Sequence, residues 1–209
     1  MKSILLKTDE VKAVLDGRKS QKRIVIKIPS GTFWLGSEIY DNKLDFGIMG
    51  TSAVYSKKIP YEIGDVLWVK ETWNCIPLHA GLYDMPDKKS NEIVGYDYWY
   101  RADDTDQNPD DKWRPSIHMP REAARIFLEV TDRWVERLQD IKDIDIKAEG
   151  IVLYDKDAEF DNECSDETRR LMEFQILWDS TIKDQDIYRY GYDANPWVIN
   201  YEFKRTDCI

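Results

Sequence analysis

Four cationic side chains lie within the seven residues 17–23, close to the start of the chain. The whole protein carries a formal net charge of −10, so this cluster is not part of a generally basic surface. Like charges that crowd together disfavour the charged form of the least solvated lysine. A neutral Lys19 would act as a base or a nucleophile, with Arg18, Lys22 and Arg23 around it. The alternative interpretation is a solvated basic turn.

Glu149 is the candidate partner of this cluster. We expect it at the C-terminal end of a short helix over residues 140–150, where the helix dipole disfavours a negative charge. A general acid/base that faces the cationic turn would explain that placement. The alternative is a surface glutamate at a frayed helix end. The functional interpretation depends on Lys19 and Glu149 facing each other across one pocket.

A second candidate segment is Trp-Arg-Pro-Ser-Ile-His-Met-Pro-Arg at residues 113–121. Its two prolines predict a short extended piece with Ser116 and His118 on one side. A Ser/His/acid triad is disfavoured, because contact between residues two apart on a strand needs an unusual bend. We therefore expect both residues to bind substrate; the alternative for His118 is a packed, hydrogen-bonded histidine.

Tryptophan residues are candidate stacking platforms for a nucleobase, because a base stacks on an aromatic face. The candidates are Trp68, Trp73 and Trp113. Core and strand packing is the alternative, and it is expected to account for most of the eight Trp and twelve Tyr.

Alternating and helical patterns predict a strand-rich α+β protein. Strands are expected over residues 3–7, 23–28, 66–72, 96–102, 124–137 and 196–204. Helices are expected over residues 8–16, with Thr8 as the cap, 140–150 and 166–183. No βαβ repetition is present, so a small mixed barrel with helices over its ends fits better than a doubly wound parallel sheet.

One domain is expected over residues 1–209, with insertions near 29–60, 76–112 and 151–166. The first insertion carries turn signals that suit a hairpin, and residues 76–95 are expected to form a loop. Acidic residues fill 103–112 and 154–166, which predicts an exposed face and a flexible lid or linker.

The composition also limits the functional class. An acidic protein is unsuited to wrapping duplex DNA, which needs a broad basic face, but a local patch suits a small ligand or a short single strand. The three cysteines are widely separated, which favours reduced thiols in the cytoplasm over a disulfide framework or a zinc site. No apolar stretch suits a signal peptide or a membrane span, and no metal or other cofactor is expected.

Several blocks in order resemble the ASCH family of the PUA-like superfamily, in particular its larger members encoded in phages and prophages. These blocks span about residues 1–205. They are DGRKSQ at 16–21, GDVLWVKETW at 64–73, the segment 113–121 quoted above, LEVT at 128–131, AEG at 148–150 and NPWV at 195–198.

The resemblance implies a PUA-like β-barrel with a cleft for RNA or a modified nucleoside. Some small members of the family are amidohydrolases that remove an acyl group from N4-acylated cytidine. They use a Lys, a Thr three positions later and a Glu, which correspond to Lys19, Lys22 and Glu149 here. Lys22 stands where the family has Thr, so either Ser20 or a water would take the role of the nucleophile. The alternatives left open are a non-catalytic RNA-binding module and a single-strand ribonuclease.

Overall fold

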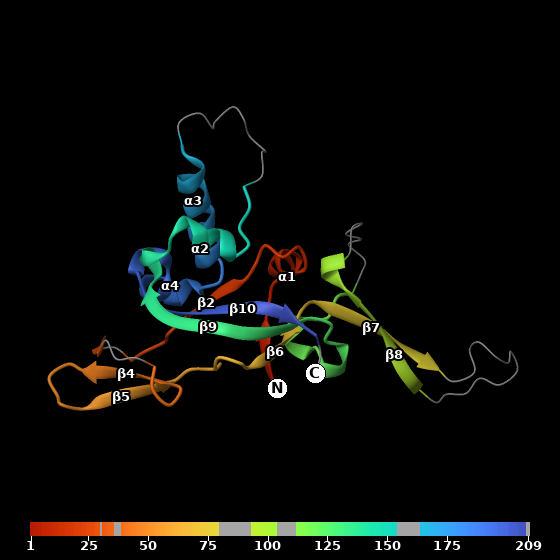
Figure 1. Cartoon of the computed structure of the whole chain (residues 1–209), viewed down its shortest axis with the longest axis horizontal. Coiled ribbons are helices and arrows are strands. Elements are labelled where there is room, and N and C mark those ends of the chain that lie inside the picture. Colours follow the sequence, from red (N-terminus) through yellow and green to blue (C-terminus); the bar gives the residue numbers. More distant parts are fainter. Residues whose placement is uncertain (30, 36–38, 80–92, 104–111, 154–163, 208–209) are drawn as a thin grey trace, which may run out of the picture.

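The computed structural model describes residues 1–29, 31–35, 39–79, 93–103, 112–153 and 164–207 (Figure 1). The strands are β1 (Lys2–Leu5), β2 (Gln21–Val25), β3 (Thr32–Trp34), β4 (Lys43–Ile48), β5 (Val54–Lys58), β6 (Val66–Lys70), β7 (Trp73–His79), β8 (Ile93–Tyr100), β9 (Phe127–Arg137) and β10 (Trp197–Thr206). The α-helices are α1 (Thr8–Leu15), α2 (Asp143–Ala148), α3 (Asp166–Asp179) and α4 (Ile187–Tyr190). Short 3-10 turns are η1 (Arg101–Asp103), η2 (Ser116–His118), η3 (Arg121–Ala123), η4 (Leu138–Asp140), η5 (Asp184–Asp186) and η6 (Tyr192–Ala194). The predicted α+β class with mostly sheet is confirmed.

The central sheet has the strand order β1-β6-β9-β10-β2. Only β1 and β6 pair in parallel, while β9 and β10 form a long antiparallel ladder through the middle of the molecule (Figure 1). β1 and β2 are the two edges, and no strand pairing between described residues closes the sheet into a barrel. Part of the space between these edges is taken by the segment 59–61, since the Tyr61 hydroxyl donates to the Ser3 carbonyl at 2.8 Å.

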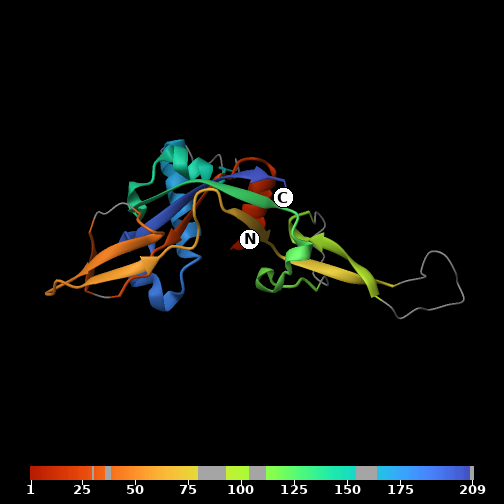
Figure 2. The same cartoon turned by 60° about the horizontal axis from the view of Figure 1, so that its bottom comes forward.

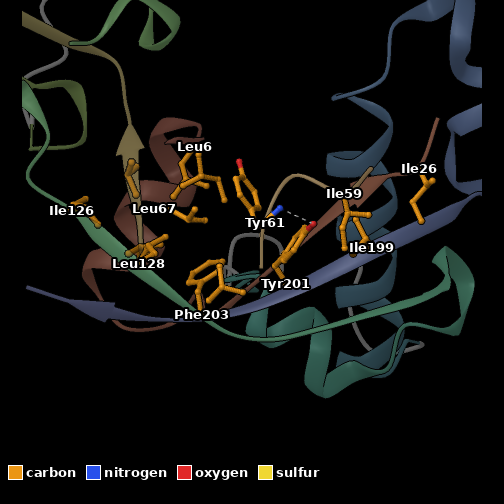
Figure 3. Close-up of a cluster of buried hydrophobic side chains, with 14 of the residues drawn as sticks. Leu6, Ile26, Ile59, Tyr61, Leu67, Ile126, Leu128, Ile199, Tyr201 and Phe203 are labelled. Atoms are coloured by element: carbon orange, nitrogen blue, oxygen red, sulfur yellow. Dashed lines mark hydrogen bonds between the residues drawn. The ribbon is translucent and has the colours of Figure 1, made fainter. Parts of the chain in front are cut away.

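One face of the central sheet is covered by α1. Val11 and Val14 of this helix are buried in the same cluster as Leu67, Tyr201 and Phe203. Figure 3 shows these last three side chains within the cluster. The predicted helix is present, but Thr8 does not cap it. The helix begins at Thr8, and the Glu10 carboxylate accepts a hydrogen bond from the Lys7 backbone N–H at 2.8 Å. Glu10 thereby satisfies a backbone donor that precedes the first turn.

The other face of the sheet carries α2 and α3. Along β10, successive side chains alternate between faces, so Val198 is buried in one cluster with Ile146 and Phe174 of these helices, while Ile199 joins the cluster on the α1 side. α3 is capped by Ser165, whose hydroxyl accepts from the Thr168 N–H. The two layers therefore bring the ends of α1 and α2 to the same edge of the sheet, at β2.

Residues 29–60, expected to form a hairpin, contain a three-stranded antiparallel sheet of order β3-β4-β5. Its inward side chains Leu44 and Phe46 are fully buried in the main core. The added strand β3 is short, and its Trp34 packs on Phe46 with ring centroids 5.1 Å apart.

Residues 76–95, expected to form a loop, instead supply parts of β7 and β8, which pair as a projecting arm (Figure 2). At residues 76–79 and 93–95 the loop prediction was wrong, because the pairing is stabilised on one face by packing from a distant segment, in which Met119 and Ala123 cover Trp73. The rest of the predicted loop, residues 80–92, lies outside the described residues. The predicted exposed loop over 103–112 and the lid over 154–166 lie mostly outside the described residues. Within the described part of the chain, no helix is both long and apolar enough to cross a bilayer.

Candidate functional site

The turn after α1 directs Lys19 inward. Gly17 adopts φ 74°, a left-handed conformation that ends the helix, and the backbone N–H groups of Arg18 and Lys19 both donate to the Ala13 carbonyl, at 2.8 and 3.0 Å. This geometry folds the chain back under the helix. The Lys19 side chain is consequently only 1% exposed, although it belongs to a strongly polar stretch of sequence.

The end of α2 meets this turn directly. Lys19 and Glu149 form an isolated antiparallel bridge, and the Ser20 N–H donates to the Ala148 carbonyl at 2.8 Å. Gly150, directly after Glu149, lies at this contact and adopts the left-handed φ of 87°. A Cβ at Gly150 would lie 2.7 Å from the Ala13 Cβ and 3.0 Å from the Lys19 Cβ. The close approach of the two segments therefore requires glycine at this position.

Lys19 and Glu149 are in direct contact. The Lys19 ammonium donates to Glu149 Oε2 at 2.7 Å and to the Glu149 carbonyl at 3.0 Å. The other carboxylate oxygen accepts from the Arg23 backbone N–H at 2.9 Å and from the Arg23 guanidinium at 3.2 Å. The structure thus brings together the two predicted residues, but as a buried ion pair and not across an open pocket. Neither of the two cavities described in the molecule is lined by Lys19 or Glu149.

Glu10 and Lys22 form the more solvated side of the cluster. Lys22 Nζ lies 2.6 Å from Glu10 Oε1, and the same oxygen lies 3.4 Å from Lys19 Nζ. Burial raises the pKa of the Glu10 carboxyl, but Lys22, Lys19 and the hydrogen bond from the Lys7 backbone outweigh it and lower this pKa to about 2. The Lys22 and Glu10 side chains remain 20% and 24% exposed, so solvent reaches the cluster from this side.

Arg23 connects the cluster to the central sheet. Its guanidinium is fully buried and lies 2.8 Å from Glu136 Oε1 on β9. The second oxygen of Glu136 accepts from the indole N–H of half-buried Trp134 at 3.0 Å. Trp134 and Glu136 occupy alternate positions of β9 and therefore face the same side of the sheet as Arg23.

Each of the four cations of residues 17–23 has its own carboxylate partner. Arg18 lies 2.8 Å from Asp16, and the other three contact glutamates as described above. The premise that like charges surround Lys19 was wrong, because α1, the residue after α2, and β9 supply the acids that pair with Lys22, Lys19 and Arg23. Ser20 follows Lys19 directly, and its carbonyl accepts from the Phe203 N–H at 2.8 Å, which holds it at the start of the β2 pairing.

The remaining predicted residues gather elsewhere, around β6. Lys70 lies over the Trp68 ring at 5.1 Å and donates to the Ile117 carbonyl at 2.9 Å, so Trp68 is close to the 3-10 turn that contains Ser116 and His118. That turn replaces the extended piece expected between the two prolines. His118 is exposed, and its expected alternative as a packed histidine was wrong.

Trp113 belongs to this second group, with the Arg101 guanidinium 5.4 Å from its ring. In the central sheet, β6 is separated from β2 by β9 and β10. No ion pair, ring contact or hydrogen bond described for this part of the chain joins the two groups. The structure therefore does not bring the predicted base-stacking tryptophans to Lys19 and Glu149.

Sequence reasoning missed three residues of the cluster. Trp134 and Glu136 could have been found from the alternation along 124–137, which places them on one face together. Glu10 carried a weaker signal, as an acid in the first turn of a predicted helix. Its contact with Lys19 and Lys22 depends on how the chain reverses at Gly17.

Among the described residues, no group of three or more His, Cys, Asp or Glu side chains is arranged to hold a metal ion. Comparisons with protein-family models, with curated proteins and with solved structures find no match for this chain.

Proposed function

We propose that the protein hydrolyses the amide of an N4-acylated cytidine at the Lys19–Glu149 pair. One observation carries this proposal: a buried ammonium lies 2.7 Å from a carboxylate whose second oxygen is fixed by the Arg23 backbone and guanidinium. A carboxylate held in one orientation beside a cation is suited to moving a proton during acyl transfer. The sequence resemblance supplies the substrate class.

The proposed step uses water as the nucleophile. Glu149 takes a proton from water as its oxygen attacks the amide carbonyl, and the Lys19 ammonium stabilises the negative charge that develops on the carbonyl oxygen. The C–N bond then breaks, Glu149 returns the proton to N4, and a carboxylic acid and cytidine leave. Water is preferred to a side chain because Lys22, at the family's Thr position, is an ammonium bound to Glu10.

In this proposal Trp134 is the stacking surface for the base, the role that the sequence suggested for Trp68 and Trp113. It is half-buried on the face that carries Arg23, and its indole N–H is bound to Glu136, which fixes the ring. A cytosine ring that stacks there would lie next to the cluster. We also propose that the architecture is a PUA-like barrel that is open between β1 and β2, where the segment 59–61 lies between the two edges.

The test is to incubate the protein with N4-acetylcytidine and to follow cytidine release by chromatography. The proposal expects turnover by the wild type, its loss in Lys19→Ala and Glu149→Gln, and its retention in Ser20→Ala. Loss in Ser20→Ala at unchanged stability would assign the nucleophile to the serine and not to water. A wild type without turnover above background overturns the proposal.

A second candidate function, binding of single-stranded RNA, is favoured by the group around β6. Cation–aromatic pairs lie there: Lys70 on Trp68 and Arg101 on Trp113, with centroid distances of 5.1 and 5.4 Å. Such surfaces stack bases and attract phosphates. Binding of a short RNA should weaken with salt at a logarithmic slope of about −0.7 per neutralised phosphate. Absence of binding at low salt would remove this function, and cleavage of the RNA that a chelator abolishes would point to a nuclease instead.

A further inference from the structure

A groove of about 500 Å³ lies between the two edge strands of the central sheet. Lys2 comes from β1. Ile24 and Val25 come from β2, and Ile26 follows that strand directly. The opposite wall is formed by the end of β5 and the segment that follows it. The full lining is Lys2, Ile24, Val25, Ile26, Lys57, Lys58, Ile59, Pro60 and Ile199. Its volume is within the range of small-molecule sites.

The charges in this groove differ from those of the Lys19 cluster, where every cation has a carboxylate. No described carboxylate lies within ion-pair distance of Lys57 or Lys58, whereas Lys2 pairs with Asp65 at 2.6 Å. Lys58 stands directly opposite Lys43 on β4, whose ammonium pairs with Asp41 at 3.2 Å, so Lys57 and Lys58 are the cations here without a described ion-pair partner. Lys57 is half-buried on the inward face of β5, opposite fully buried Leu44. This excess of positive charge would be neutralised by an anion in the groove.

β2 is an edge strand, so the backbone groups on its outer side face no partner strand among the described residues. The backbone N–H of Ile26 donates to Trp197 on β10, whereas that of Arg23 points away from β10 and donates to Glu149. Since backbone groups alternate in direction along an antiparallel edge, the N–H and carbonyl of Val25 also point away from β10. Val25 lines the groove, so its backbone adds a polar pair at the groove wall.

The apolar part of the groove is aliphatic. Four isoleucines and a proline line it, and no aromatic ring of the residues that the structure describes does. A nucleobase would find no ring face for stacking, whereas an alkyl chain gains from burial against such walls. Lysine ammonium groups suit a single carboxylate, since they act as point charges without the planar fork of arginine.

We propose that this groove binds an aliphatic carboxylate of medium chain length, with its head group at inward-facing Lys57 and its chain along Ile24, Ile26 and Ile59. This inference does not depend on the proposed hydrolysis. The competing explanation is that lysines on the edge strand β5 only prevent sheet-to-sheet aggregation. That explanation requires no ligand and no preference for chain length.

The experiment is isothermal titration calorimetry of the 209-residue chain with decanoate below its micellar concentration. Decanoate should bind at least about tenfold more tightly than hexanoate, since each buried CH₂ tightens binding about fourfold. The double variant Lys57→Gln/Lys58→Gln should bind decanoate roughly fivefold or more weakly, while Lys183→Gln, at an exposed lysine outside the groove, should be unchanged. Circular dichroism of each variant checks the fold.

Three further ligands separate the alternatives. Decanol should bind more weakly than decanoate because it lacks the charge, and inorganic phosphate and cytidine monophosphate should bind more weakly because they lack the chain. No heat of binding with decanoate, equal affinity for hexanoate and decanoate, or tighter binding of phosphate or the nucleotide would each overturn the proposal. An unchanged decanoate affinity in the double lysine variant would overturn it as well.

Discussion

The Glu149 carboxylate accepts a hydrogen bond at 2.7 Å from the ammonium of Lys19, a residue 130 positions earlier in the chain. The two side chains are 9% and 1% exposed. Removing two charges from water is unfavourable unless both are paired and hydrogen-bonded. Here the second carboxylate oxygen is bound by Arg23 and the Glu149 carbonyl also binds the ammonium, so both charges have further hydrogen bonds.

Breaking the pair from one side should destabilise the protein strongly. Lys19→Met leaves a buried carboxylate with one cation fewer, and we expect the free energy of unfolding to fall by about 3 kcal/mol in urea titration. Lys19→Met/Glu149→Leu should recover part of that loss, because no unpaired charge remains. The exposed pair Lys204–Glu129 provides the matched control, and its disruption should change stability by less than about 1 kcal/mol. Equal effects at the two pairs would contradict the burial of the first.

Acid should weaken the fold through Glu10. Its folded-state pKa is lowered from 4.5 to about 2, so the unfolded chain takes up the proton first as the pH falls. The stabilisation is fully present above pH 4.5 and is lost between about pH 4.5 and 2. It amounts to roughly 3 kcal/mol. Urea titrations across this range should show a shallower loss in Glu10→Gln than in the wild type, and identical slopes would refute the assignment.

Gly150 tests the packing that aligns the pair. Gly150→Ala places a Cβ 2.7 Å from the Ala13 Cβ at φ 87°, so it adds a steric clash to left-handed strain. Gly64 has φ 86° with nothing within 4 Å of the added Cβ, so Gly64→Ala measures the strain alone. The Gly150 variant should lose about 2 kcal/mol more than the control in thermal or urea unfolding. Equal losses would show that α1 and α2 are not in close contact there.

Trp134 tests where the base binds. If cytosine stacks on this ring, Trp134→Leu should raise KM for N4-acetylcytidine about tenfold, since stacking contributes about 1–3 kcal/mol per base. The same change at Trp68 should leave KM unaltered. A raised KM in Trp68→Leu alone would move the base to the surface around β6.

The sequence was informative wherever the signal is local. Alternation predicted β6 and β9 closely, and the apolar repeat predicted α3, because each pattern depends on one face meeting a core. The strand expected over 96–102 corresponds to most of β8, whereas its partner β7 was not predicted, since the packing partners of this arm come from residues 113–125. Threonine suits a helix cap by residue type, but the helix begins at Thr8 itself, and the Glu10 carboxylate accepts a hydrogen bond from the backbone N–H of Lys7.

The site was predictable in part. Lys19 and Glu149 were paired through the family resemblance and an unfavourable helix position, and the structure places them in contact. Their burial could not be foreseen, because the acids that pair with Lys22, Lys19 and Arg23 come from α1, the residue after α2, and β9. The tryptophans were expected at the same site because of their aromatic type, and Ser116 and His118 because of their segment between two prolines. Neither signal carries information on distance in a folded sheet.

The most direct test of the account is the rate of cytidine release from N4-acetylcytidine by three proteins: the wild type, Glu149→Gln and His118→Ala. We predict turnover in the wild type, a loss of at least about 100-fold in Glu149→Gln, and an unchanged rate in His118→Ala. Turnover that is absent from the wild type, or that survives in Glu149→Gln, would contradict the claim that this pair performs the chemistry.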